Sequence, residues 1–141
     1  MSYIDNHTNA LCQAFGDNFK VEDIEGGCEI IQYKRTEEVV IPKAIRGKPV
    51  LRVAGMSFEE HRKIITSVVI PNSVIEICDG AFERCERLCN VVIPESVTII
   101  GDCAFYGCDC LESVEIRSDK NLISIHPDAF PEHTQINFVV I

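Results

Sequence analysis

Eight cysteines and four histidines are the residues of this 141-residue chain with the greatest capacity for chemistry. Thiolates and imidazoles bind zinc, and a thiolate beside a base can act as a nucleophile. Four of these residues share one spacing, because each comes three residues after a phenylalanine: His61, Cys85, Cys108 and His133. If those phenylalanines stack in neighbouring turns, the four side chains form one column, an arrangement that suggests a metal site.

The geometry of such a column argues against zinc. Neighbours in a parallel ladder lie about 4.8 Å apart, so four in a row span roughly 14 Å, whereas zinc holds its ligands at about 2.0 to 2.3 Å. We therefore expect no metal ion and no cofactor. We interpret Cys85 and Cys108 as buried thiols that close a turn, and we expect all the cysteines to be reduced. Cys89, Cys103 and Cys110 have no partner in the column and are expected to be accessible.

The other polar residues show no catalytic pattern. Ser73 and Ser96 lie in Pro-x-Ser-Val turns with no histidine in register, so we expect their hydroxyls to bond the local backbone. Adjacent acids such as Glu59 and Glu60 lack the apolar pocket that a general acid needs. No cysteine lies beside the histidine and acid that would mark a nucleophile. The sequence therefore predicts a protein that is not an enzyme.

Composition and charge exclude several classes of protein. Hydrophobic residues make up 46% of the chain and charged residues 25%, which are values of globular proteins, and no apolar run reaches the length of a membrane span. The net charge of -9 repels nucleic acid and anionic lipid. Residues 71–141 hold twelve acids and four bases, so a basic protein would be steered to this half.

The start of the chain bears on its location. The first twenty residues show no basic segment followed by an apolar one, so no secretory signal is visible. We expect a cytoplasmic protein, or a cell-surface protein if the native chain is longer.

An internal repeat positions these residues. Residues 68–90 and 91–113 match at ten positions 23 apart, which are Val68, Pro71, Ser73, Val74, Ile77, Asp79, Ala81, Phe82, Cys85 and Leu88 with their counterparts. A third unit from Val114 has two extra residues, which places Ile125 and Phe130 at the positions of Ile100 and Phe105. It also aligns Ile136 with Leu111. A degenerate unit begins at Val39.

Each unit buries little by itself, so the units must stack. The first apolar run of each unit predicts a short parallel sheet, with Val97, Ile100, Phe105 and Leu111 filling the interior. The fold class expected is α/β: a right-handed, leucine-rich-repeat-type solenoid, a short horseshoe of about four units over residues 39–141.

The motif IPxSVxxIGxxAFxxCxxLxxVxI over Ile93–Ile116 resembles the BspA-like leucine-rich repeat family of bacterial and protist proteins. Residues 19–58 are similar to the opening segment of that family. The resemblance implies noncatalytic recognition of proteins, often at cell surfaces, and supplies no universal functional residue.

The terminal turns of a solenoid must be capped, because their apolar interior would otherwise face solvent. We expect residues 1–38 to form an N-terminal cap, with a short helix whose buried face includes Ile4 and Phe15, followed by a hairpin that turns at Gly26 and Gly27. At the other end, residues 138–141 align with the first run of a further repeat and would leave an open edge strand. Either this edge forms a homodimer or it is shielded by residues 126–133 or by residues of a longer native chain.

The surface of the stacked first runs is the predicted partner site. The period aligns one exposed column, Val40, Val69, Val92, Glu115 and Val140, and a second, Ser67, Asn90, Ser113 and Phe138. We assign partner binding to Val69, Val92, Glu112 and Glu115. The alternatives are that valine reflects strand propensity alone, or that a basic cluster between Lys43 and Arg52 binds instead.

The function expected is a noncatalytic protein-protein interaction module. The alternative is a small intracellular, acidic inhibitor or immunity-type protein that blocks a target enzyme or complex. Neither binds nucleic acid or inserts into a membrane.

Overall fold

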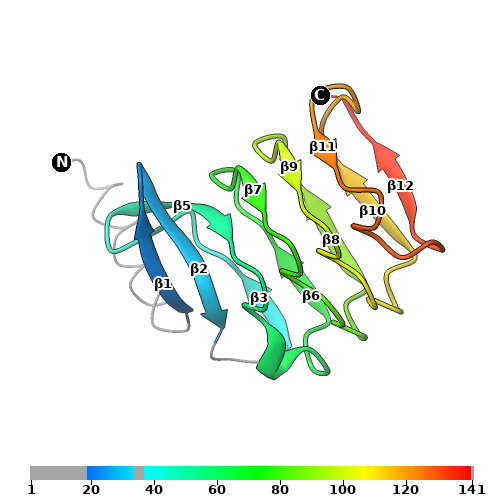
Figure 1. The fold of residues 1–141 in the computed structure, drawn as a ribbon, viewed down its shortest axis with the longest axis horizontal. Coiled ribbons are helices and arrows are strands. Elements are labelled where there is room, and N and C mark those ends of the chain that lie inside the picture. Colours follow the sequence, from blue (N-terminus) through cyan, green and yellow to red (C-terminus); the bar gives the residue numbers. More distant parts are fainter. Residues whose placement is uncertain (1–18, 34–36, 141) are drawn as a thin grey trace.

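The computed structural model describes residues 19–33 and 37–140, which wind between two sheets as a β-solenoid (Figure 1). Sheet A has the strand order β1-β2-β5-β7-β9-β11, with β4 beside β5, and sheet B has the order β12-β10-β8-β6-β3. Each sheet B strand begins a turn, so the described chain makes about five turns.

Sheet B contains the first apolar run of every unit. Its strands are β3 (Glu38–Val40), β6 (Ser67–Val69), β8 (Asn90–Ile93), β10 (Ser113–Ile116) and β12 (Gln135–Phe138). All neighbouring pairs are parallel. This is the parallel sheet that the repeat predicts.

Sheet A joins the predicted N-terminal hairpin to the second runs of the units, and its parallel part was not predicted. Its strands are β1 (Phe19–Ile24), β2 (Gly27–Tyr33), β4 (Ala44–Ile45), β5 (Lys48–Val53), β7 (Glu76–Ile77), β9 (Ile99–Ile100) and β11 (Ser124–Ile125). Ile77 pairs with Ile100, and Ile100 with Ile125, which stacks their side chains inside the solenoid. Strands of two residues are too short to show an alternating pattern in the sequence.

The N-terminal part of sheet A is a hairpin. β1 and β2 pair antiparallel, and the turn between them uses Gly26 at φ 83°, a left-handed conformation that glycine adopts without strain. β2 then pairs parallel with β5 and continues the sheet. The predicted cap helix, with Ile4 and Phe15, lies outside the described residues.

The α/β assignment is wrong for residues 19–33 and 37–140. The single helical segment in these ranges is a 3₁₀-helix, η1 (Glu59–His61). The chain instead returns from sheet A to sheet B through tight turns after each Ala-Phe pair, with Arg84 and Gly107 at positive φ. A 23-residue unit that forms two strands leaves too few residues for a helix.

A ladder of phenylalanine rings fills the interior. The ring centroids of Phe58 and Phe82 are 4.7 Å apart, those of Phe82 and Phe105 are 5.1 Å apart, and those of Phe105 and Phe130 are 4.9 Å apart. The first three rings are at most 1% exposed. The repeat predicts this ladder, and its parallel rings connect four consecutive turns.

The third unit differs from the others at its end. Ile125 and Phe130 lie where the period places them, but Ile136 pairs with Val114 and not with Leu111. In the preceding unit the Leu111 N–H donates to the carbonyl of Cys108, and here the equivalent bond runs from the Thr134 N–H to the carbonyl of Pro131. Thr134 therefore takes the place of Leu111, and the turn after Phe130 is shorter. The last strand therefore begins at residue 135 and not at the predicted residue 138.

Within the two described ranges, no helix has the length and apolar character needed to cross a membrane.

Candidate binding groove on sheet B

The outward side chains of sheet B form a column along β3, β6, β8 and β10. The strand register places Val40 beside Val69, Val69 beside Val92, and Val92 beside Glu115. The three valines are 46, 56 and 41% exposed, respectively. The period predicts these four positions, and the strands position them because alternate residues of a strand point to opposite faces.

The C-terminal members of both predicted columns are wrong. Asn137, and not Val140, ends the valine column, and Gln135, and not Phe138, ends the second column. The early start of β12 shifts both residues out of register.

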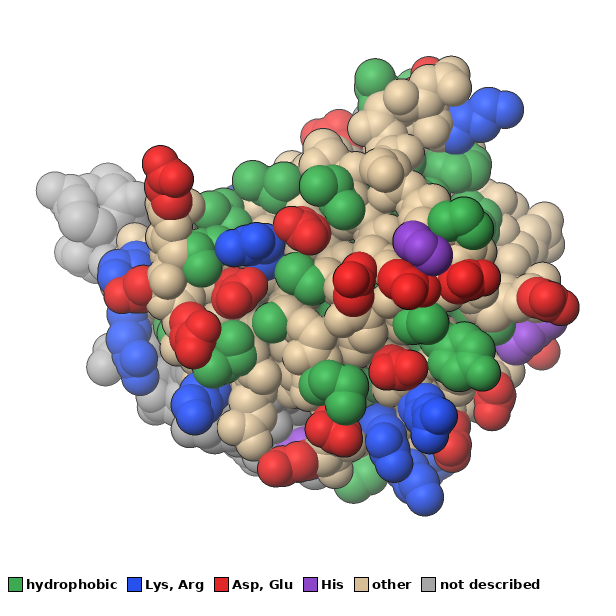
Figure 2. Space-filling view, in the orientation of Figure 1, with side chains coloured by type: hydrophobic (Ala, Val, Ile, Leu, Met, Phe, Trp, Pro, Cys, Tyr) green, Lys and Arg blue, Asp and Glu red, His purple; other side chains and the backbone are tan. Residues whose placement is uncertain are grey.

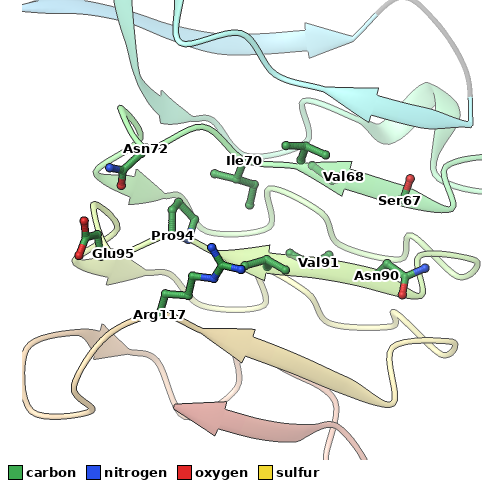
Figure 3. Close-up of a pocket in the computed structure, with 11 residues that line it drawn as sticks. Ser67, Val68, Ile70, Asn72, Asn90, Val91, Pro94, Glu95 and Arg117 are labelled. Atoms are coloured by element: carbon green, nitrogen blue, oxygen red, sulfur yellow. The ribbon is translucent and has the colours of Figure 1, made fainter. Parts of the chain in front are cut away.

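A groove of about 510 Å³ runs over β6 and β8, and Val69 and Val92 line it (Figure 3). Ser67 and Asn90 lie at one end of the groove, and Asn72 and Glu95 lie at the other. The remaining lining residues are mostly apolar, and they are Val68, Ile70, Val91, Pro94 and Arg117. An aliphatic strip between two polar ends suits an extended peptide segment or a protein loop.

Arg117 forms one wall of the groove and was not singled out from the sequence. Figure 3 shows its side chain reaching from beyond β10 toward Pro94. Its Nε lies 2.6 Å from the Oε2 of Glu115. A signal was available, because Arg117 is two residues after Glu115 and so points to the same face of the strand.

The two predicted acidic residues occupy different positions. Glu115 adjoins the groove through its ion pair with Arg117, and its side chain is 39% exposed. Glu112 is exposed in the turn before β10 and is not part of the groove lining. The structure therefore brings Val69, Val92 and Glu115 together and leaves Glu112 to one side.

The acidic character of the chain is visible on its surface. Figure 2 shows acidic side chains distributed across one face, with apolar side chains between them. On sheet A, Arg52 lies between two acids, with its Nε 3.5 Å from Glu29 and its Nη1 3.8 Å from Glu76. These partly exposed pairs contribute little to stability but neutralise part of the predicted basic cluster.

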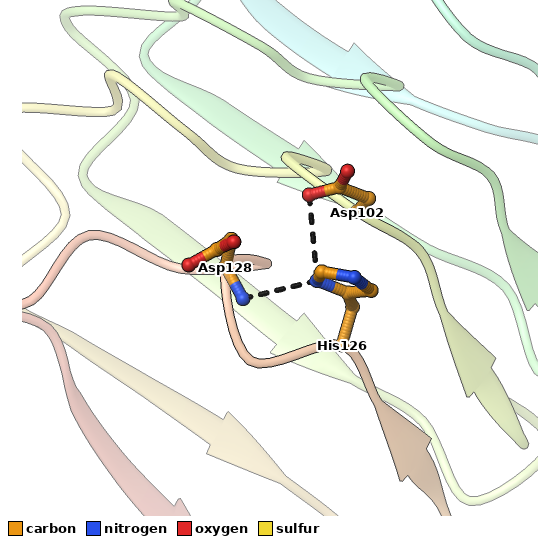
Figure 4. A group of neighbouring side chains, drawn as sticks. All are labelled: Asp102, His126 and Asp128. Carbon is orange, nitrogen blue, oxygen red and sulfur yellow. Dashed lines mark hydrogen bonds and ion pairs between the residues drawn. The ribbon is translucent and has the colours of Figure 1, made fainter.

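A second polar cluster joins Asp102, His126 and Asp128 (Figure 4). The Asp128 N–H donates to the Nδ1 of His126 at 3.1 Å, and Asp102 Oδ1 lies 3.3 Å from the same nitrogen. Nδ1 accepts the N–H only when it is unprotonated and donates to Asp102 only when it is protonated, so it cannot form both hydrogen bonds at once. The repeat gives no sign of this cluster, because His126 takes the position that Gly101 has in the preceding unit.

The predicted column of histidines and cysteines forms only in part. Cys85 and Cys108 are fully buried in consecutive turns, and the Cys108 thiol donates to the Phe82 carbonyl at 3.2 Å. Burial raises the pKa of Cys85 to about 12 and raises that of Cys108 as well. His133 is exposed, because the shortened turn after Phe130 moves it out of the column.

The prediction that the hydroxyls of Ser73 and Ser96 bond the local backbone is wrong. The hydroxyl oxygens of Ser73 and Ser96 are buried and have no hydrogen-bond partner among the described residues. The turn is instead tied to the next one by Asn72, whose Oδ1 accepts the Ser96 N–H at 3.2 Å.

Comparison with known proteins agrees with the architecture. The family model "BspA type Leucine rich repeat region (6 copies)" matches residues 54–141. A leucine-rich repeat protein from Bacteroides capillosus ATCC 29799 is similar in structure, with a TM-score of 0.74 and 24% identity over 86% of this chain and 94% of that one. One from Bacteroides ovatus ATCC 8483 has a TM-score of 0.61 and 26% identity.

The two structural relatives differ in length. The match covers 86% of this chain but only 36% of the Bacteroides ovatus protein. No curated protein sequence gives a significant match. Because the family model covers more than half of the residues, and the stacked turns have the architecture that its repeat implies, the chain belongs to the BspA-type leucine-rich repeat family.

Proposed function

We propose that this protein is a noncatalytic protein-recognition module that binds its partner through the groove on sheet B. The observation that carries the proposal is the exposed valine column within the groove, where Val69 and Val92 are 56 and 41% exposed. Solenoid proteins present repeated surfaces of this kind to their partners.

The partner's chemistry follows from the lining of the groove. Aliphatic side chains would cover the valines, and each buried CH₂ group contributes about 0.8 kcal/mol. Glu95 at the end of the groove favours a basic residue next to the aliphatic segment, and Glu115 could bind such a residue in exchange for Arg117. We therefore propose a basic protein that inserts an aliphatic segment.

Two matched variants test the proposal. Val92→Asp places a carboxylate in the groove, and Ile99→Asp places one on sheet A in the same turn at nearly equal exposure, 41 against 42%. Both variants should keep the wild-type circular dichroism spectrum. The Kd of a protein that both wild type and Ile99→Asp capture from a lysate should rise by about tenfold with Val92→Asp, a loss of about 1.4 kcal/mol.

The reverse pattern, with capture lost for Ile99→Asp and kept for Val92→Asp, would move the site to sheet A. The identity of the partner distinguishes the two candidate functions. A captured enzyme whose activity the chain blocks would favour the inhibitor or immunity-type function over a general interaction module.

A cytoplasmic location is part of the proposal. The spacing of the cysteines supports it, because that spacing follows the repeat and not a disulfide framework of the kind found in small secreted proteins. A native chain with further segments would instead be compatible with the cell surface.

A second copy of the chain is the other partner that we propose. β12 is the last strand of sheet B in the described residues, and Phe138 and Val139 are 38 and 40% exposed at this edge. An edge strand offers unpaired backbone groups to another strand, which supports an end-to-end homodimer.

A further inference from the structure

Two exposed thiols, those of Cys89 and Cys110, lie in neighbouring turns where the chain enters sheet B. Cys89 directly precedes β8, and Cys110 is three residues before β10. The 23-residue period aligns Cys110 with Arg87 and Cys89 with Glu112, so the repeat gives no sign that the two cysteines meet.

The backbone places both cysteines beside the dipeptide Glu86-Arg87. The N–H of Cys110 donates to the carbonyl of Glu86 at 3.2 Å, and the thiol of Cys89 turns back to the carbonyl of Arg87, also at 3.2 Å. The two cysteines therefore approach one segment from adjacent turns, and the Cys110 thiol is close enough to raise the pKa of Cys89. Adjacent turns of the solenoid lie about 4.8 Å apart, so a disulfide between neighbouring turns is possible where the two side chains turn toward each other, as they do over Glu86 and Arg87.

The other described cysteines lack this combination of exposure and proximity. Cys85 and Cys108 are stacked in consecutive turns but are fully buried, which excludes a soluble oxidant. Cys103 is partly exposed, but its thiol donates to the Oδ1 of Asp102 at 3.3 Å. Cys89 and Cys110 are the two cysteines that are exposed in the described part of the chain.

We propose that Cys89 and Cys110 form a reversible dithiol site that a low-molecular-weight disulfide, such as oxidised glutathione, converts to an intramolecular disulfide. The Cys110 thiolate attacks one glutathione sulfur, the glutathione disulfide bond breaks, and one glutathione leaves as a thiolate that takes up a proton. The deprotonated Cys89 then attacks the Cys110 sulfur and releases the second glutathione. Two protein thiols are oxidised, and one glutathione disulfide is reduced to two thiols.

The environment of Cys89 suits the second, intramolecular step. Partial desolvation and then the neighbouring Cys110 thiol raise the pKa of Cys89, so a smaller fraction is thiolate at neutral pH. Proximity compensates for the small thiolate fraction of Cys89 only when the sulfur that it attacks, that of Cys110, is already held beside it. The rate of closure should therefore rise with pH.

Peptide mapping of the full chain tests the site. The protein is incubated with oxidised glutathione, alkylated while unfolded, and cleaved after glutamate without reduction. This cleavage places Cys89 in residues 87–95, and places Cys110 in residues 96–112 with Cys103 and Cys108. We expect the two peptides to be joined, with fragment spectra locating the alkyl label on Cys103 and Cys108. Labelling of Cys89 should fall by about tenfold.

Cys110→Ser should abolish the joined peptides, and the matched control Cys103→Ser should leave them unchanged. A link from Cys89 to Cys103 or Cys108, disulfide-linked dimers as the main product, or unchanged labelling of Cys89 would overturn the proposal. The experiment needs no binding partner, so its result is independent of the groove.

Discussion

Replacing Phe105 by alanine removes the ring at the centre of the phenylalanine ladder. Phe105 is fully buried and stacks on Phe82 at 5.1 Å and on Phe130 at 4.9 Å, so neither neighbour can fill the space without leaving its own turn. A buried phenylalanine costs about 3 to 5 kcal/mol when truncated to alanine, and the two ring stacks account for about 0.5 to 1.5 kcal/mol each of that loss. We expect a value near the upper end.

Urea denaturation followed by circular dichroism measures this cost as a shift of the midpoint at constant slope. Tyr106→Ala is the control, because Tyr106 is the next residue, is 51% exposed and should change stability by less than about 0.5 kcal/mol. Phe130→Ala should fall between the two, because Phe130 is only partly buried. A loss below about 1 kcal/mol for Phe105→Ala would refute the view that the ladder holds the turns together.

The surface predictions concern association. Glu112→Lys combined with Glu115→Lys should slow capture of a basic partner and flatten the salt dependence of the association rate, since charges at the rim act mainly on association; unchanged rates in surface plasmon resonance would exclude the acidic margin. If the chain forms an end-to-end dimer through β12, Phe138→Lys should reduce the molar mass measured by light scattering to that of a monomer, whereas a wild-type chain that is already monomeric at high concentration would rule the dimer out.

The repeat made the core predictable from sequence. Val74, Ile77, Phe82 and Leu88 recur at one spacing, and residues that recur in a solenoid must stack, so their burial follows without knowledge of the strands. The exposed valines followed from the same argument, since alternate residues of sheet B must face outward.

Features that occur once could not be found in this way. Arg117 takes the position that Pro94 has in the preceding unit, and His126 follows the inserted residues and takes the position of Gly101, so neither side chain recurs in another turn. The insertion before Ile125 lengthens this unit, and the shorter turn after Phe130 shortens it. The register of β12 depends on the balance between the two changes, which the period of the sequence does not give. The approach of Cys89 and Cys110 to the same segment depends on local turn geometry and not on the period.

Methyl chemical shifts measure most directly whether sheet B is the binding face. With valine and isoleucine methyl groups labelled with carbon-13, titration of the purified partner should shift the resonances of Val69 and Val92 in the groove. It should leave those of Ile75 and Ile99, which are 45 and 42% exposed outside the groove, unchanged. Shifts confined to Ile75 and Ile99 would contradict the assignment of the groove as the site of protein recognition.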